Sequence, residues 1–176
     1  MARIVLLGIG NVLMGDDAAG PTAVKLLEAG WEFSPEVEVI EGGTPGLDIA
    51  SLVEGAEALL VVDAVRARGD PGEIRLLDEA ALLGRAPGLS LSPHEPGLRE
   101  ALLTMELSGG RPRRVRLVGI VPERIDVPVG LSAPVRAALP RLLERVLEEL
   151  RALGGDFRPR ARPLEPDLWW ERPPAG

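Results

Sequence analysis

The sequence predicts an α/β protein in which helices cover both faces of a single β-sheet. Short apolar runs of strand length alternate along the chain with segments of helical character. Two of these runs, residues 4–7 and 58–62, contain no polar position at all. A strand without polar alternation is buried on both faces, which is typical of a three-layer α/β/α sandwich.

The first half of the chain contains three of the expected strands. Residues 4–7 form the first strand, which ends at Gly8 and Gly10, where the backbone can take conformations closed to other residues. Gly20-Pro21 opens a helix that Gly30 stops, because proline suits a first helical turn and glycine a helix end. The next segments are a strand at 37–40, a glycine-rich loop at 41–46, a short helix at 47–54 and a strand at 58–62.

The second half begins with residues 73–77, whose alternating pattern indicates an exposed edge strand. It is followed by an irregular segment at 83–96, a helix at 97–107, a strand at 114–120 and a loop at 121–131. The last expected element is a helix that Ser132 caps and that ends near residue 153. We expect residues 1–153 to form one domain. The tail, residues 154–176, is rich in proline, arginine and glycine, and we expect it to lie on the surface or to be mobile.

Composition excludes several classes of function. The chain has 176 residues, no cysteine and a formal net charge of −7, so it offers neither thiolate ligands nor the basic patch of a nucleic-acid-binding protein. No segment reaches the length of about 18 apolar residues that a membrane span needs. The first strand begins at once, which argues against a targeting peptide. We therefore expect a cytoplasmic protein with no nucleic-acid or membrane partner.

The glycines after the first strand resemble the start of a dinucleotide-binding loop, but the pattern is incomplete. The third glycine of that fingerprint would fall at position 13, which is leucine. The loop then continues to Asp16 and Asp17, whose charges would repel a pyrophosphate. Carboxylates on a loop suit a cation better.

Acidic side chains follow two of the buried strands. Asp16 and Asp17 come after the first strand, and Asp63 ends the strand at 58–62. In a parallel sheet such positions meet at one edge, where ligands bind. Together with His94, the only histidine, two carboxylates could hold a divalent metal with coordination positions left open for hydrolysis.

Each of these residues also has a structural explanation. An aspartate before a helix is often an N-cap, and a single histidine in a loop is more often structural than a ligand. Asp16 and Asp17 compete for the ligand role, because neighbouring side chains of an extended segment face opposite ways. One binds and the other caps the helix or orients a ligand, and spacing does not choose between them.

Several motifs, in order along residues 3–153, resemble the nickel–iron hydrogenase maturation proteases. They are Gly8-Ile9-Gly10-Asn11-Val12-Leu13-Met14-Gly15-Asp16-Asp17, Glu41-Gly42-Gly43-Thr44-Pro45-Gly46, Val61-Val62-Asp63-Ala64, Ser92-Pro93-His94, and Val118-Gly119-Ile120-Val121-Pro122-Glu123 with Val129-Gly130-Leu131-Ser132. The resemblance implies that Asp17, Asp63 and His94 are both the metal ligands and the catalytic residues. This sequence departs from the family pattern at Asp17, where relatives often have glutamate, and at Ala18, where they often have glycine.

The resemblance also implies a fold and a reaction. The fold is a phosphorylase/hydrolase-like three-layer sandwich with a mixed five-stranded sheet of order 2-1-3-5-4, in which strand 4 is antiparallel. The reaction is an endoproteolytic cut that removes a short C-terminal peptide from the precursor of a hydrogenase large subunit after nickel insertion. The precursor is therefore the expected partner.

The expected mechanism uses nickel that the precursor supplies, and the sequence does not say whether a divalent metal is also resident. Asp17, Asp63 and His94 engage that nickel, and a water activated by the metal or by a carboxylate cleaves the peptide bond. Asn11 and Asp16 support the site. Residues 42–44 (Gly42, Gly43 and Thr44) either line the path of the extended substrate or simply form a tight turn.

Three other functions compete with this one. A nucleotide-binding protein would bind nucleotide saturably, and a general metallopeptidase with permanent zinc would cleave unrelated peptides. A non-catalytic metal chaperone would bind the precursor without shortening it.

Overall fold

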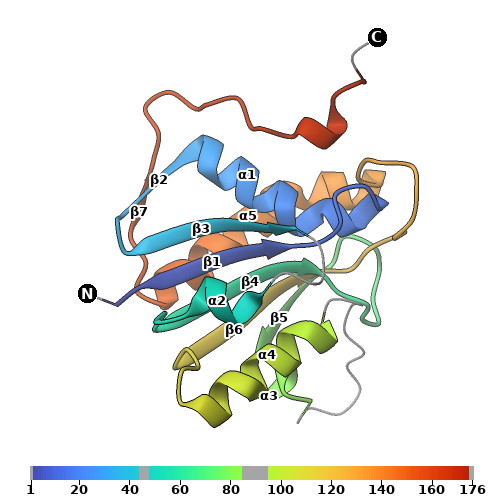
Figure 1. Ribbon diagram of the computed structural model, residues 1–176. Coiled ribbons are helices and arrows are strands. Elements are labelled where there is room, and N and C mark those ends of the chain that lie inside the picture. The colour runs from blue at the N-terminus through green and yellow to red at the C-terminus, as the bar shows by residue number, and fades with distance from the viewer. Residues whose placement is uncertain (1, 44–47, 85–94, 175–176) are drawn as a thin grey trace.

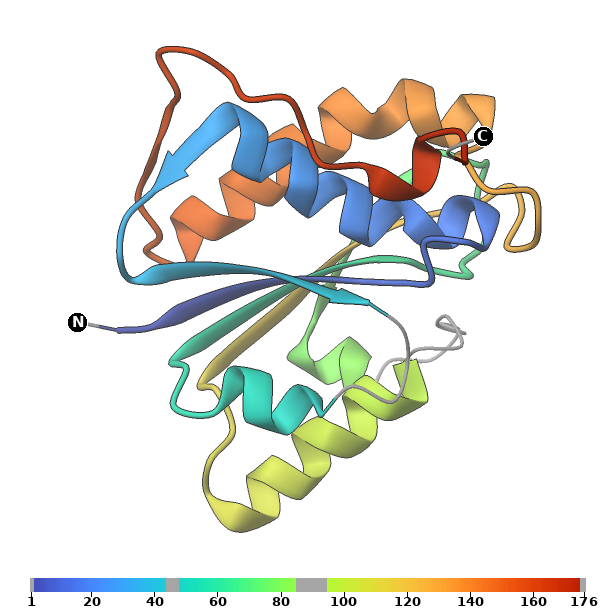
Figure 2. The same cartoon turned by 45° about the horizontal axis from the view of Figure 1, so that its top comes forward.

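In the computed structural model, which describes residues 2–43, 48–84 and 95–174, a five-stranded sheet lies between two helical layers (Figures 1 and 2). The strands of this sheet, in chain order, are β1 (Ile4–Ile9), β3 (Val37–Gly43), β4 (Ala58–Ala64), β5 (Ile74–Asp78) and β6 (Arg114–Ile120). Their spatial order is β3-β1-β4-β6-β5. Only β5 runs antiparallel to its neighbour in this sheet. Numbered among themselves, the strands have the order 2-1-3-5-4, which confirms the predicted topology and the edge position of the fourth strand.

The helices divide between the two faces of the sheet. One face is covered by α1 (Ala19–Gly30) and α5 (Ala133–Ala152), and the other by α2 (Ile49–Val53), α3 (Glu79–Leu82) and α4 (Glu95–Ser108) (Figure 2). Two short 3₁₀ helices, η1 (Gly15–Ala18) and η2 (Trp169–Glu171), complete the described helices. No helix in the described ranges is both long and apolar enough to cross a membrane.

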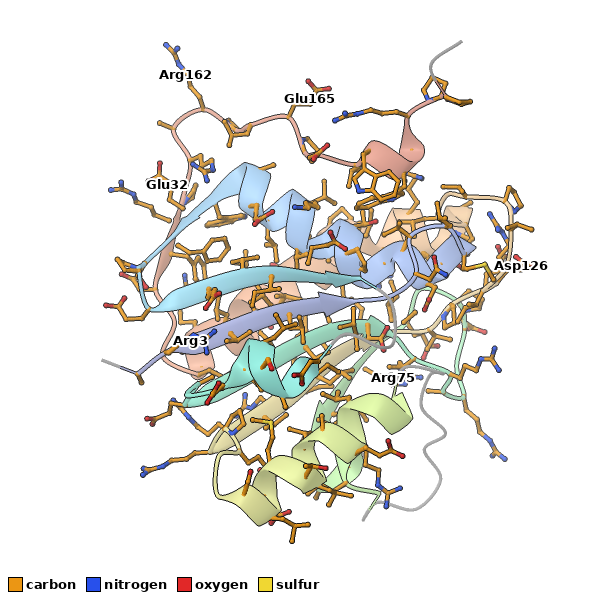
Figure 3. The ribbon with its side chains drawn as sticks, viewed as in Figure 1. Arg3, Glu32, Arg75, Asp126, Arg162 and Glu165 are labelled. Carbon is orange, nitrogen blue, oxygen red and sulfur yellow. The ribbon has the colours of Figure 1, made fainter. Side chains whose placement is uncertain are left out.

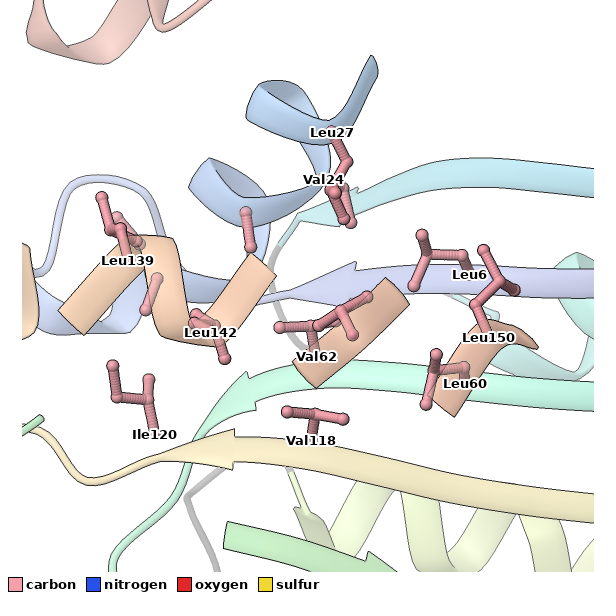
Figure 4. Packing of buried hydrophobic residues seen from close by; sticks show 14 of the residues in the cluster. Leu6, Val24, Leu27, Leu60, Val62, Val118, Ile120, Leu139, Leu142 and Leu150 are labelled. Carbon is pink, nitrogen blue, oxygen red and sulfur yellow. The ribbon is translucent and has the colours of Figure 1, made fainter. Parts of the chain in front are cut away.

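The buried strands divide their side chains between two cores. Leu6, Leu60 and Val62 pack with the cluster under α1 and α5, as Figure 4 shows. Leu7 and Val61, one position along, pack with the cluster under α2, α3 and α4. This alternation is the period of an extended chain, and it explains why these strands carry no polar position.

Helix boundaries differ from the expectation in detail. The first helix extends through Gly30 rather than stopping before it, and Pro21 falls in its first turn, where no backbone N–H is required. Ser132 is the N-cap residue of α5, but its hydroxyl donates to Asp16 instead of capping the helix. Part of the segment expected to be irregular, residues 85–94, lies outside the described residues. Residues 83–84 before it form a turn, and residues 95–96 after it are the start of α4.

A second sheet of two strands was not predicted. β2 (Trp31–Phe33) pairs antiparallel with β7 (Phe157–Pro159) of the tail. From there the tail follows α1, where the amides of Arg160 and Leu164 donate to the carbonyls of Gly30 and Ala29. Arg162 and Glu165 point away from the helix (Figure 3). The described tail therefore runs over the outer side of α1, and its side chains Phe157 and Trp170 are buried against the cluster of α1 and α5 (Figure 2).

Candidate active site at the carboxyl edge of the sheet

The site lies where β1 and β4 end, beside the N-terminus of α1. Gly8 of β1 pairs with Val62 of β4, so Asp63 lies one residue beyond this register. The α1 backbone comes close to both strand ends at Gly20, where a Cβ would overlap the carbonyl oxygens of Ile9 and Val62. This close approach requires glycine and brings η1, which contains Asp16 and Asp17, against β4.

The turn after β1 fixes the position of Asp17. The backbone N–H of Asn11 donates to Asp17 Oδ2 over 2.7 Å, and the Asn11 side-chain oxygen accepts from the Leu13 N–H over 3.0 Å. Gly10 has a φ of 148°, and a Cβ there would overlap the Asp17 carbonyl oxygen. Gly10 and Asn11 thus shape the chain so that it returns to present the Asp17 carboxylate beside the strand end.

Asp16, the neighbouring carboxylate, is a structural anchor. It is fully buried, and its Oδ2 accepts from the backbone N–H groups of Glu123 and Arg124 and from the Ser132 hydroxyl. Its Oδ1 accepts from the Ser132 N–H over 2.7 Å, at the N-terminus of α5. Four donors at a helix N-terminus hold this buried carboxylate in one position. Asp16 therefore joins the β1–α1 loop (residues 10–18) to the β6–α5 loop (residues 121–132).

Asp17 and Asp63 are both buried, with 2% and 1% of their surfaces exposed. Asp63 lies on β4 opposite Gly119 of β6, near the middle of the sheet. The structure thus brings Asp16, Asp17 and Asp63 to one edge, as the sequence predicts. Within residues 2–43, 48–84 and 95–174, no group of three or more acidic, histidine or cysteine side chains is arranged to hold a metal. His94, the third predicted ligand, lies outside the described residues, and α4 begins at Glu95 on the same side of the sheet as the strand ends (Figure 1).

The Gly42-Gly43 segment closes the site on the β3 side. Gly43 has a φ of 63°, and its carbonyl accepts from the Gly10 N–H over 3.0 Å. At Gly42 a Cβ would come within 2.8 Å of Leu7 Cδ1. Gly42 and Gly43 are the last two residues of β3, so this strand extends beyond the predicted range 37–40 into the segment expected to be a loop. Both glycines have a conformational or packing reason to be glycine, and the role of a substrate path stays a prediction. Thr44 lies outside the described residues.

Sequence reasoning missed Arg124. Its guanidinium donates to the carbonyls of Pro128 and Gly130 at 3.0 and 3.1 Å, and its backbone carbonyl accepts from the Asp16 N–H at 3.0 Å. The only signal in the sequence was a single arginine within a proline- and glycine-marked loop. Its partner Asp16 lies 108 residues away, so no local spacing relates the two.

Comparison with known proteins gives consistent matches. Residues 21–149 match the family model described as hydrogenase maturation protease, a range that includes Asp63 and His94 and begins just after the β1–α1 loop. The Hydrogenase 2 maturation protease of Escherichia coli is 33% identical over 162 residues, covering 90% of this chain and 96% of that protein. The hydrogenase expression/formation protein HoxM of Cupriavidus necator is 34% identical over 164 residues, covering 93% of this chain and 81% of that protein.

Solved structures give the same result. The hydrogenase maturating endopeptidase HybD from E. coli superposes with a TM-score of 0.83 at 32% identity, covering 90% of this chain and 98% of that one. The [NiFe] hydrogenase maturation protease HybD from Thermococcus kodakarensis superposes with a TM-score of 0.68 at 28% identity, covering 84% and 98%.

Proposed function

We propose that this chain, which belongs to the hydrogenase maturation protease family, removes a short C-terminal peptide from the nickel-loaded precursor of a nickel–iron hydrogenase large subunit. Its relatives and structural neighbours are endopeptidases of hydrogenase maturation, so the chain is a peptide hydrolase that acts in that process. The nickel, the cleaved peptide and the residues responsible are the parts that we propose.

The proposed site consists of Asp17, Asp63 and His94. The observation that carries the proposal is the placement of two buried carboxylates at one edge of the sheet, one in η1 after β1 and one near the end of the adjacent strand β4. Carboxylate oxygens and imidazole nitrogen are suitable ligands for nickel, which here arrives as part of the substrate. His94 directly precedes α4 in the sequence, and α4 begins beside this edge.

The proposed reaction is hydrolysis of one peptide bond. Nickel in the precursor positions the scissile bond at the carboxylates and can polarise a bound water. A carboxylate of the site takes a proton from a water molecule as the oxygen of that water attacks the carbonyl carbon. The carbon–nitrogen bond then breaks, and the leaving amine receives the proton. Asn11 orients Asp17 through its backbone N–H, and Gly42 and Gly43 offer an unobstructed backbone along which the peptide extends.

The experiment that tests this function compares two forms of the substrate. The protein is incubated with nickel-loaded and with nickel-free precursor, and the intact mass of the large subunit is measured. We expect loss of a C-terminal peptide only with nickel. A precursor that is bound but keeps its full mass would identify a chaperone instead.

The His94→Ala variant tests the third ligand. We expect it to abolish processing while the melting temperature stays within about 2 °C of wild type, because a ligand for the substrate's nickel contributes little to folding. Thermal unfolding and intact mass are measured on the same preparation. A melting temperature lowered by about 5 °C or more would instead support a structural role for the histidine.

A further inference from the structure

An exposed apolar surface borders the proposed active site. It consists of Leu13 from the β1–α1 loop and of Val127, Pro128 and Val129 from the β6–α5 loop, and we call these four residues the apolar rim. Leu13, Val127 and Val129 are 47%, 70% and 40% exposed. Three of the eight large hydrophobic side chains that are exposed within the described ranges therefore belong to these two loops.

The two loops that form the rim lie side by side (Figures 1 and 2). The Asp16 N–H donates to the Arg124 carbonyl over 3.0 Å. At Gly15, a Cβ would come within 2.9 Å of the Asp126 carbonyl oxygen, so the backbones are in close contact there. Asp126 lies on the outer side of the β6–α5 loop (Figure 3). The two loops that carry the rim residues are therefore in backbone contact, although they are more than 100 residues apart in sequence.

The β6–α5 loop is braced from within. The Arg124 guanidinium bonds to Asp126 Oδ1 and to the carbonyls of Pro128 and Gly130, and Asp16 holds the two ends of the loop. These bonds fix the backbone on both sides of Val127. A surface ordered before binding loses less conformational entropy when a partner covers it.

Leu13 of the rim also lies close to Asp17 along the β1–α1 loop. The Asp17 N–H donates to the Met14 carbonyl, and Leu13 is the residue before Met14. A protein substrate that brings a peptide bond to Asp17 must therefore lie over or against the β1–α1 loop. The rim has no charged side chain of its own, so its complement on that substrate is apolar.

We propose that the apolar rim docks an apolar patch on the folded part of the hydrogenase large-subunit precursor, next to the scissile bond. This inference rests on the proposed function, because the precursor is the partner that the site selects. The rim supplies binding to the body of the precursor, while Asp17, Asp63 and His94 act on the peptide bond. Removing its apolar side chains raises KM and leaves kcat largely unchanged.

The test uses the double variant Leu13→Ser/Val127→Ser. Its matched control is Leu107→Ser, which removes a 91% exposed leucine from the end of α4. Binding of each protein to immobilised nickel-loaded precursor gives Kd, and processing followed by intact mass gives kcat and KM. We expect the double variant to raise Kd and KM at least tenfold with kcat within a factor of two. The control has wild-type values, and all three proteins melt at similar temperatures.

Each outcome bears on one of the two proposals. Unchanged Kd and KM in the double variant, with normal wild-type processing, overturns the docking surface alone. Wild-type binding without shortening of the precursor overturns the proposed function, and Kd then still decides the docking surface. Absence of wild-type binding overturns both.

Discussion

Asp16 and Asp17 are neighbours in the sequence with different surroundings in the structure. Asp16 faces the N-terminus of α5 and accepts four hydrogen bonds from the β6–α5 loop and Ser132. Asp17 faces back toward β1, where the Asn11 N–H binds it. The structure thus gives Asp16 an anchoring role, which is consistent with Asp17 being the acid that meets substrate.

The Asp16→Asn variant tests the anchoring role. An amide presents a donor where the wild-type protein has only acceptors, so at least one buried donor loses its partner. We expect a loss of about 3 kcal/mol in the free energy of unfolding, which for a chain of this size lowers the melting temperature by about 6–12 °C. Thermal unfolding by circular dichroism measures it.

The control for this variant is Asp126→Asn, which changes an exposed acid in the same loop. Asp126 pairs with Arg124 at the surface, where such pairs contribute less than about 1 kcal/mol. A melting temperature of Asp16→Asn equal to that of Asp126→Asn would show that the buried hydrogen bonds do not hold the loops together.

The sequence could predict that an acidic pair lies at the carboxyl edge of the sheet, but the residues alone could not assign the two roles. The donors to Asp16 come from 107 to 116 residues further along the chain, beyond any local pattern. The same separation in sequence explains why the residues alone predict Ser132 only as a helix cap. Its position is correct, and only the folded chain shows that its hydroxyl serves Asp16.

At the scale of elements, the tail is the main departure from expectation. Its composition predicts a segment outside the core, yet the tail supplies β7 to the small sheet, and Trp170 is buried against the cluster of α1 and α5 from the outer side of α1. A strand of three residues has too few positions to show alternation, and a single buried tryptophan has no period. The structure shows a strap that crosses α1, with Glu171 paired to Arg136 in the first turn of α5 at 2.9 Å (Figure 2).

Adjacent tryptophans allow a matched test of the strap. Trp170 is 5% exposed and Trp169 is 52% exposed. We expect Trp170→Ala to lower the free energy of unfolding by about 3 kcal/mol, because it removes a large buried side chain. Trp169→Ala should change it by less than about 1 kcal/mol. Chemical denaturation measures both, and equal effects of the two variants would contradict an anchoring role for Trp170.

At the scale of the whole molecule, the sheet order explains where the site lies. The chain goes from β1 outward to β3 and then returns to β4 on the other side of β1, so the strand order reverses between β1 and β4. Loops that leave adjacent strands at such a point diverge to opposite faces and leave space for a ligand. Asp17 lies in η1 after β1, and Asp63 is the second-last residue of β4, which is why a local pattern of apolar runs ending in acids was sufficient to predict the edge.

The measurement that tests the central claim most directly is the intact mass of nickel-loaded precursor after incubation with the Asp17→Asn and Asp63→Asn variants. Each change removes a carboxylate and keeps the shape of the side chain. Both variants are compared with wild type at equal melting temperature. We predict at least 100-fold slower loss of the C-terminal peptide in each, because each lacks a carboxylate on which positioning of the substrate or proton transfer depends. Shortening of the precursor at the wild-type rate by either variant would contradict the account.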